Sequence, residues 1–142
     1  MNEQIIETAR AWIGTPYRHQ ASLKGVGADC LGLIRGVWRD IYNDEPELPP
    51  AYTRNWAEAG TDDTLLLAAG RHLMPAARSD IQPGDVLLFR YRQNLPCKHA
   101  AIAASASRMI HAYDGAAVAE TSIGSWWARR LAAIFTFPDI NS

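Results

Sequence analysis

One cysteine and two histidines have the residue types and the setting needed to break an amide bond. Cys30 follows Asp29 at the start of an apolar stretch with helical spacing, so we expect it in the first turn of a helix that Asp29 caps. His99 and His111 lie in the C-terminal part of the chain, in segments with the pattern of strands. A thiol, an imidazole base and a second polar group that orients the base together make a nucleophilic hydrolytic site.

The position of Cys30 predicts an ionised thiol. The first turn of a helix has unpaired N–H groups and about half a positive charge, which favour a thiolate. Helix N-termini and a nearby imidazolium typically lower a cysteine pKa to about 3.5 to 7.5. Gly32 and Gly36 each cost about 1 kcal/mol of helix propensity, so we expect them to allow close approach to a sheet or a substrate. The alternative is that Cys30 is a small buried apolar residue.

The spacing of the two histidines predicts that their side chains are neighbours. If 99–103 and 107–111 form a hairpin around 104–106, paired residue numbers sum to 210, and His99 lies opposite His111. Their Cβ atoms would then be about 4.5 to 5.5 Å apart. A loop with an even number of residues would place them on opposite faces. The alanine-rich first strand would let the cysteine helix pack closely, so we expect the sulfur to face an imidazole across the helix–sheet contact.

The N-terminal part is predicted to be a helix followed by a loop near the nucleophile. One apolar stripe of this helix is made by Ile5, Ile6, Ala9, Trp12 and Ile13. Gly14 and Pro16 end the helix. The next residues lead directly into the cysteine helix and place Tyr17 beside it, whereas we interpret His19 as a solvated loop residue.

The rest of the chain predicts an α+β domain. Residues 43–64, rich in proline and acidic residues, indicate a surface excursion, and 64–74 indicate a short helix. Predicted strands then follow at 86–91, 98–104, 107–113, 117–121 and 132–137, with a short helix at 125–130. Helices that precede a run of strands are typical of an α+β fold in which an antiparallel sheet packs on the cysteine helix.

The composition of the chain argues against several classes of function. The chain has 142 residues, of which 48% are hydrophobic and 20% charged, so we expect a single domain over 1–142. A net charge of −1 without a basic run argues against nucleic acid or an anionic membrane as partner. No apolar run is long enough to span a membrane. The N-terminus lacks the basic-then-apolar pattern of a signal peptide. Two cysteines are too few for a disulfide scaffold, so we expect synthesis and folding in a cytoplasm.

Five motifs resemble those of the NlpC-type cell-wall cysteine peptidases, which are compact relatives of papain. They are Gly-Thr-Pro-Tyr ending at Tyr17, Ala-Asp-Cys-Leu-Gly-Leu around Cys30, Pro-Gly-Asp-Val-Leu-Leu-Phe around Asp85, Lys-His-Ala-Ala-Ile-Ala around His99, and Met-Ile-His-Ala around His111. The motifs occur in the family's order over nearly the whole chain. The resemblance implies a papain-like fold, and it extends to a short branch associated with phage tails.

The resemblance also implies roles for residues. Cys30 would be the nucleophile, His99 the base and His111 the residue that orients it, while Tyr17 and Asp29 would bind substrate. The implied substrate is a peptidoglycan stem peptide, commonly cut between γ-D-glutamate and diaminopimelate or lysine, with no metal or cofactor. The chain departs from the family at Leu31, where a serine is common. Phage tail proteins are the implied partners, and a phage particle would carry the protein to the periplasm or cell wall.

Two other interpretations remain open. Cys30, Cys97, His99 and His111 could supply four ligands to zinc, although the chain has no close Cys-x-x-Cys pair. Alternatively, the protein is a catalytically silent binding or structural module of a tail tip. We interpret Cys97 as a spectator at the rim of the site, able to form a disulfide with Cys30 if the two come within reach.

Two adjacent tryptophans have no assigned role. Trp126 and Trp127 cannot both face the same side of a helix, so we expect one of them to be exposed. The sequence leaves open whether they pack in the core or contact a glycan or an assembly partner.

Overall fold

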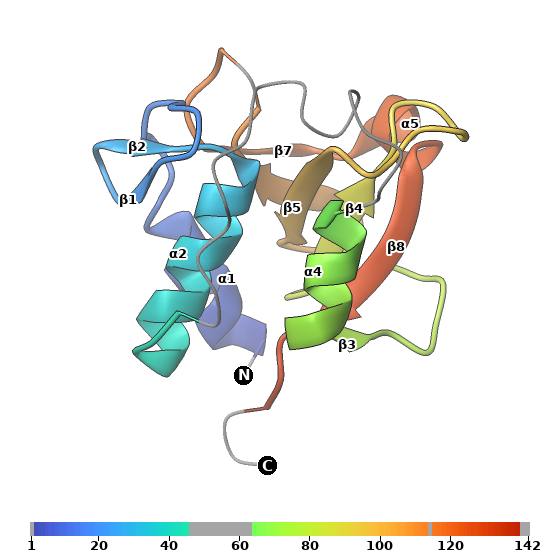
Figure 1. Ribbon diagram of the computed structural model, residues 1–142, viewed down its shortest axis with the longest axis horizontal. Coiled ribbons are helices and arrows are strands. Elements are labelled where there is room, and N and C mark those ends of the chain that lie inside the picture. The colour runs from blue at the N-terminus through green and yellow to red at the C-terminus, as the bar shows by residue number, and fades with distance from the viewer. Residues whose placement is uncertain (1, 46–63, 114, 140–142) are drawn as a thin grey trace.

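A computed structural model of the chain describes residues 2–45, 64–113 and 115–139. Its architecture is the predicted α+β: helices come first along the chain, and an antiparallel sheet is formed by later strands (Figure 1). The helices of this part are α1 (Asn2–Arg10), α2 (Cys30–Tyr42), α4 (Thr64–His72) and α5 (Gly124–Ala128). A small hairpin of β1 (Ser22–Leu23) and β2 (Gly27–Ala28) directly precedes α2.

The main sheet has six strands in the order β3-β8-β4-β5-β6-β7. Their bounds are β3 (Met74–Pro75), β4 (Val86–Phe89), β5 (His99–Ala103), β6 (Arg108–His111), β7 (Ala119–Ser122) and β8 (Leu131–Thr136). All neighbouring strands in it are antiparallel. The order differs from a simple meander, because the last strand returns across the sheet and pairs with the free edge of β4.

The two faces of this sheet pack against different elements. One, here called the α2 face, carries Val86, Leu88, Ala100, Ile102 and Ile110, which pack with Leu33 and Val37 of α2. The other, here called the α5 face, carries Leu87, Phe89, Ala101, Ala103 and Met109, which pack with Ile123 and Trp127. Successive strand residues alternate between the faces, so neighbours along one strand contribute to different cores.

The two glycines of α2 allow close packing of elements that lie N-terminal to it. A Cβ atom on Gly36 would lie 2.0 Å from the ring of Trp12, and one on Gly32 would lie 1.8 Å from the carbonyl oxygen of Ala21. The expectation that these glycines serve a sheet or a substrate is therefore wrong. They let the N-terminal segment press against the cysteine helix and hold it in place.

The end of α1 explains a further difference from the predictions. Helix α1 ends at Arg10, so Ile13 leaves the expected stripe and is 45% exposed, whereas Trp12 is 1% exposed. The excursion expected at 43–64 lies largely outside the described residues.

Within the part of the chain that the structure describes, no helix is long and apolar enough to cross a membrane.

Candidate active site

The nucleophile candidate stands at the first residue of α2, as the sequence predicts. Asp29 is the N-cap, and its Oδ1 accepts a hydrogen bond from the Gly32 N–H at 2.7 Å. Its Oδ2 accepts another from the Gln20 N–H at 2.7 Å. The capping role of Asp29 is confirmed, and because the carboxylate is buried, these bonds fix the start of the helix firmly. Substrate binding by Asp29 stays a prediction.

The Cys30 sulfur lies against the backbone on both sides of His99. Its thiol donates to the carbonyl oxygen of Lys98 at 3.8 Å, and the Ala100 N–H is directed at the sulfur from the other side. The N–H groups of Cys30 and Leu31 point at the same atom from the first turn of α2. The side chain is half-buried. The helix terminus and the start of β5 are therefore in contact at the sulfur.

The thiol is protonated at neutral pH, contrary to the expectation from its helix position. Burial, followed by the negative charge of Asp29, raises the pKa of Cys30 to about 12. The N–H groups aimed at the sulfur lower the pKa, but their effect is smaller. The same carboxylate that caps the helix offsets the positive end of its dipole, and removing the sulfur from water disfavours the thiolate.

The two imidazoles form a hydrogen-bonded chain with a threonine. His99 Nε2 and His111 Nδ1 are 2.9 Å apart, and His111 Nε2 lies 3.0 Å from the Thr121 hydroxyl. His99 is 3% exposed and His111 7% exposed. With Nε2 of His99 engaged by His111, Nδ1 is the ring nitrogen left for a nucleophile. Thr121, which the sequence analysis did not single out, extends the chain from β7.

The hairpin that brings the rings together has a different register from the predicted one. Ile102 pairs with Ile110 and Ala103 with Met109, so paired numbers sum to 212 rather than 210. The loop is therefore centred on Ala106. It keeps an odd number of residues, so the two rings still share a face. They meet diagonally rather than directly across the strands.

Aromatic side chains enclose the base on the α5 face. Trp127 stacks on His99 with ring centroids 4.7 Å apart and an interplanar angle of 29°. The ring centroid of Phe89 lies 6.0 Å from that of His99. Tyr113 approaches His99 edge-on, with ring centroids 5.5 Å apart. The observed register, extended along β6, sets Tyr113 opposite His99. The spacing of Tyr113 two residues after His111 is the signal that could have identified it.

The side of the sheet on which the base lies corrects another expectation. Helix α2 packs on the α2 face, whereas both imidazoles lie with Phe89 and Trp127 on the α5 face. The sulfur therefore does not face a ring across the helix–sheet contact. It contacts the backbone of Lys98 and Ala100 instead, on either side of His99, the first residue of β5.

Both imidazoles are neutral at pH 7. Desolvation, followed by the charge of His111, lowers the pKa of His99 well below its usual 6.5. Burial lowers the pKa of His111 to about 4. The resting site therefore holds a neutral thiol and two neutral rings, because each group is removed from water.

The loop before α2 places two residues near the cap. Tyr17 forms a parallel bridge with Ala28 and packs, partly buried, against the same core as Cys30. Its predicted contact with substrate stays untested. His19 Nδ1 lies 4.0 Å from the Asp29 carboxylate, and the His19 side chain is only 23% exposed. The interpretation of His19 as a solvated residue is wrong.

Cys97 is not at the rim of the site. It is fully buried in the core on the α2 face, and both cysteines are free thiols. The proposed zinc ligands all fall within the described residues, where no group of three or more His, Cys, Asp or Glu side chains is placed to hold a metal ion. The zinc interpretation therefore finds no support in the arrangement of these side chains.

Comparison with known proteins identifies relatives. The model of the NlpC/P60 family matches residues 14–135. The Gamma-DL-glutamyl hydrolase of Bacillus subtilis (strain 168) is 27% identical over 141 residues, which cover 96% of this chain but only 30% of that protein. The Probable endopeptidase NlpC of Escherichia coli (strain K12) is 25% identical over 138 residues, covering 92% of this chain and 76% of that protein.

A solved structure shares the fold. The NlpC/p60 domain of the peptidoglycan hydrolase SagA superposes with a TM-score of 0.64 at 22% identity, over 96% of this chain and 99% of that chain. The likeness agrees with the order of helices and strands described above. Since the family model covers most of the sequence, including all three residues of the candidate site, the chain belongs to the NlpC/P60 family.

Proposed function

We propose that this protein is a cysteine endopeptidase that cleaves amide bonds in peptidoglycan stem peptides, at the bond between γ-D-glutamate and diaminopimelate or a similar residue. The contact of the Cys30 sulfur with the peptide groups on both sides of His99 carries this proposal. Membership of the NlpC/P60 family supports it. The names of the relatives, a glutamyl hydrolase and a peptidoglycan hydrolase, support the class of bond and of substrate.

Because the thiol and both imidazoles are neutral at rest, the first step must include transfer of the thiol proton. As the sulfur attacks the scissile carbonyl carbon, the thiol proton passes to Nδ1 of His99. Nδ1 must therefore be unprotonated at rest, so His99 Nε2–H donates to His111 Nδ1, and His111 Nε2–H donates to Thr121. The imidazolium that forms is stabilised by His111 through this chain. It then gives its proton to the departing amine, leaving a thioester on Cys30.

The second step releases the acyl product. Water attacks the thioester carbonyl while His99 Nδ1 takes its proton, and that proton returns to the sulfur as the carbon–sulfur bond breaks. In both steps the developing oxyanion lies near the first turn of α2, where the N–H groups of Cys30 and Leu31 point at the sulfur. Loss of one such donor typically lowers the rate by about 10²- to 10³-fold.

Digestion of purified peptidoglycan, followed by mass spectrometry of the soluble fragments, tests the proposal. We expect fragments that end at γ-D-glutamate, and no fragments from the Cys30→Ala protein. Cys97→Ala serves as the matched control for the loss of a thiol. Undigested peptidoglycan that nevertheless retains the folded wild-type protein would support the binding-module alternative and contradict the peptidase assignment.

We also propose that a phage particle carries the protein to the periplasm or cell wall, which the resemblance to phage-associated family members supports. Tail proteins would then be its partners. Mass spectrometry of purified particles tests this route, and absence of the protein from particles of a phage that encodes it would contradict it.

A further inference from the structure

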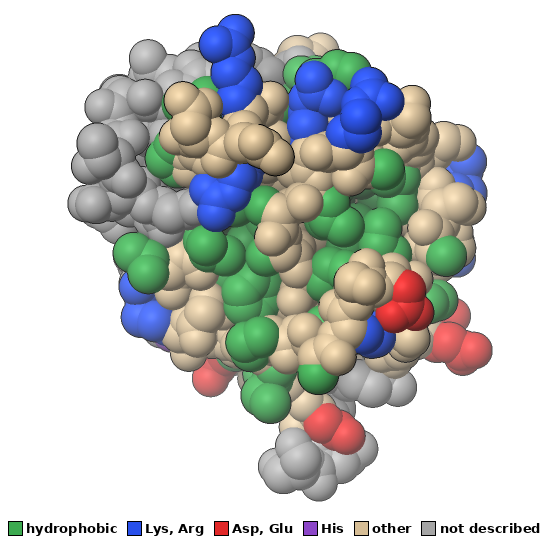
Figure 2. Space-filling model, turned by 90° about the vertical axis from the view of Figure 1, so that its right-hand side faces the viewer, with side chains coloured by type: hydrophobic (Ala, Val, Ile, Leu, Met, Phe, Trp, Pro, Cys, Tyr) green, Lys and Arg blue, Asp and Glu red, His purple; other side chains and the backbone are tan. Residues whose placement is uncertain are grey.

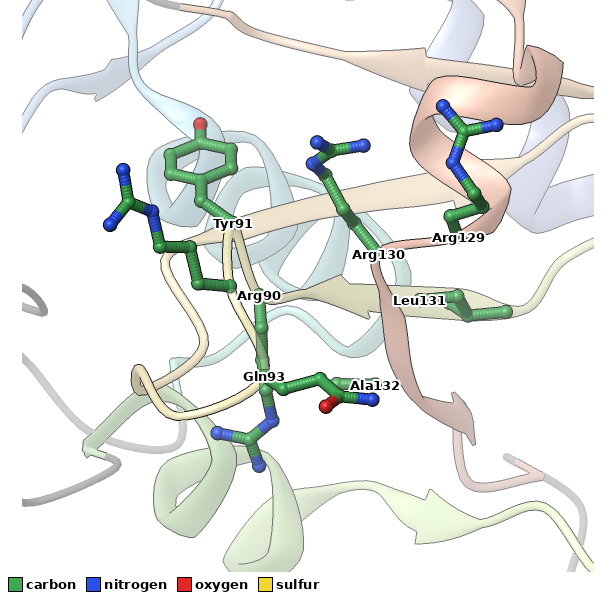
Figure 3. Close-up of a pocket in the computed structure, with 8 residues that line it drawn as sticks. Arg90, Tyr91, Gln93, Arg129, Arg130, Leu131 and Ala132 are labelled. Atoms are coloured by element: carbon green, nitrogen blue, oxygen red, sulfur yellow. The ribbon is translucent and has the colours of Figure 1, made fainter.

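A hollow lined by arginines opens on the side of the molecule that carries α5 and β8. Its volume is about 640 Å³, and its basic lining comes from Arg90 and Arg92 after β4 and from Arg129 and Arg130 before β8. Figure 2 shows basic side chains gathered in the upper part of this side, next to a hydrophobic area. In Figure 3 the guanidinium groups of Arg129 and Arg130 and the hydroxyl group of Tyr91 point the same way.

The charges in the hollow are poorly balanced by the protein. Within the described residues, Arg92, Arg129 and Arg130 form no ion pair with a carboxylate, whereas Arg10 and Arg78 do. The chain as a whole has a net charge of −1, so the positive charge of the hollow is a local feature of this side. Like charges placed together repel one another, and an anionic ligand relieves that repulsion.

Two of the arginines are held in place before any ligand arrives. Arg130 donates from Nη1 to the Trp126 carbonyl oxygen at 2.8 Å, and its guanidinium lies 3.8 Å from the centroid of the Trp126 ring. Its Nε is buried and has no hydrogen-bond partner. Arg90 donates from Nη1 to the Leu95 carbonyl oxygen at 2.8 Å. Guanidinium groups fixed in this way lose little entropy on binding.

Aromatic contacts connect the hollow to the candidate catalytic residues. Tyr91, which lines the hollow, lies 6.2 Å from Trp127, and Trp127 stacks on His99. The Lys98 ammonium lies 5.4 Å from the Tyr91 ring centroid, while the Lys98 carbonyl contacts the Cys30 thiol. The hollow is thus linked to the candidate site through Tyr91, Trp127 and Lys98.

We propose that this arginine hollow is a subsite for carboxylates of the substrate that lie outside the scissile bond. The inference rests on the proposed peptidase function. Arginine presents a planar fork that binds a carboxylate through two parallel hydrogen bonds, so several arginines suit a chain that carries more than one free carboxylate. The ligand class is thus an acidic peptide. The hollow would raise affinity for it without taking part in the chemical step.

Kinetics with two peptides test the inference. One is L-Ala-γ-D-Glu-meso-diaminopimelate-D-Ala with free carboxylates, and the other is the same peptide with the carboxylates of its last two residues amidated. We expect the wild-type KM to be about tenfold lower for the free-carboxylate peptide. In Arg92→Gln/Arg129→Gln the two KM values should become equal, with kcat within twofold of wild type. High salt should also reduce the wild-type difference.

A double variant with the same loss of charge serves as the control. Arg10→Gln/Lys24→Gln removes two exposed positive charges that are paired with Glu120 and Asp40, away from the hollow. It should keep the wild-type KM difference. A KM difference that survives in Arg92→Gln/Arg129→Gln would overturn the inference. Stabilisation of wild type by glycerol phosphate but not by the free-carboxylate peptide would also overturn it, in favour of a phosphate site.

A binding measurement separates this inference from the proposed function. In the Cys30→Ala background, calorimetry with the free-carboxylate peptide should give about tenfold weaker binding when Arg92 and Arg129 are replaced by glutamine. If wild type cleaves neither peptide, the peptidase proposal fails, but this loss of affinity would still support the subsite. Equal affinities in the two proteins would contradict the subsite whatever the activity.

Discussion

The two faces of the central sheet pack against different elements, and the candidate site uses both. The α2 face anchors the helix that presents Cys30, in a core of aliphatic and aromatic side chains. On the α5 face, three aromatic side chains enclose His99: Phe89, Trp127 and Tyr113. The nucleophile and the base are therefore held by separate cores, which meet at the start of β5.

This difference shows how the site controls charge. On the α5 face, burial keeps both imidazoles neutral, because the desolvated rings cannot take up a second proton at pH 7. At the start of α2, burial and the cap carboxylate keep the sulfur protonated. Charge is expected to appear only during the reaction, when the thiol proton moves to His99.

After loss of the nucleophile, the largest expected effect comes from removing the base. His99→Gln should lower kcat by about 10²- to 10⁴-fold, the usual contribution of a positioned general base. Release of a stem-peptide fragment, measured by chromatography, gives the rate. His72→Gln is the control, since His72 lies on α4 and contacts Trp38 instead of the site. Activity of His99→Gln above a tenth of wild type would contradict the role of His99.

The next prediction concerns the charge state of the nucleophile. With a pKa of about 12, the thiolate fraction of Cys30 should rise tenfold with each pH unit, so alkylation by iodoacetamide should speed up about a thousandfold from pH 6 to pH 9. Mass spectrometry of the Cys30 peptide measures this rate. Cys97 should stay unmodified in the folded protein, because it is fully buried. A rate that is constant between pH 6 and 9 would instead indicate a thiolate–imidazolium pair.

Acid should destabilise the packing on the α5 face. His111 has a folded-state pKa of about 4, below the 6.5 of the unfolded chain, so the unfolded state binds more protons between these values. The stabilisation from a neutral His111 is complete above pH 6.5 and is lost as pH falls towards 4, by about 3 kcal/mol. Urea unfolding at several pH values measures it. His111→Gln should show a smaller decline, and an unchanged decline would contradict burial as the cause.

The smallest expected effect tests the enclosure of the base. Trp127→Leu should lower kcat about tenfold, and it should shift the acid limb of the kcat/KM profile to higher pH, because water would reach His99. Trp127→Phe keeps an aromatic ring and should restore both values. A pH profile unchanged by Trp127→Leu would show that Trp127 only packs against its neighbours.

Local patterns in the sequence were sufficient for much of the fold and of the site. The polar entry before Cys30 correctly predicted a capped helix start, because a cap depends on residues within one turn. The odd-numbered loop between His99 and His111 correctly predicted that the two rings share a face. Both depend on contacts close in sequence or on the strict alternation of a strand.

Features that depend on distant residues were not predicted. The register of the hairpin, which sets Tyr113 opposite His99, depends on how both strands pack in the sheet as well as on the loop. The return of β8 beside β4 was missed because strand order depends on which edge remains free. Trp127 gained its place on His99 through a helix that joins two strands distant in the sheet.

The sequence alone determined which groups could react, because residue identity, helix capping and strand alternation are set within a few residues. Only the tertiary structure decided their protonation, the face on which the base lies and the approach of the sulfur around the start of β5. Those properties depend on burial and on long-range packing, so they arise only when the cores on the two faces of the sheet form together.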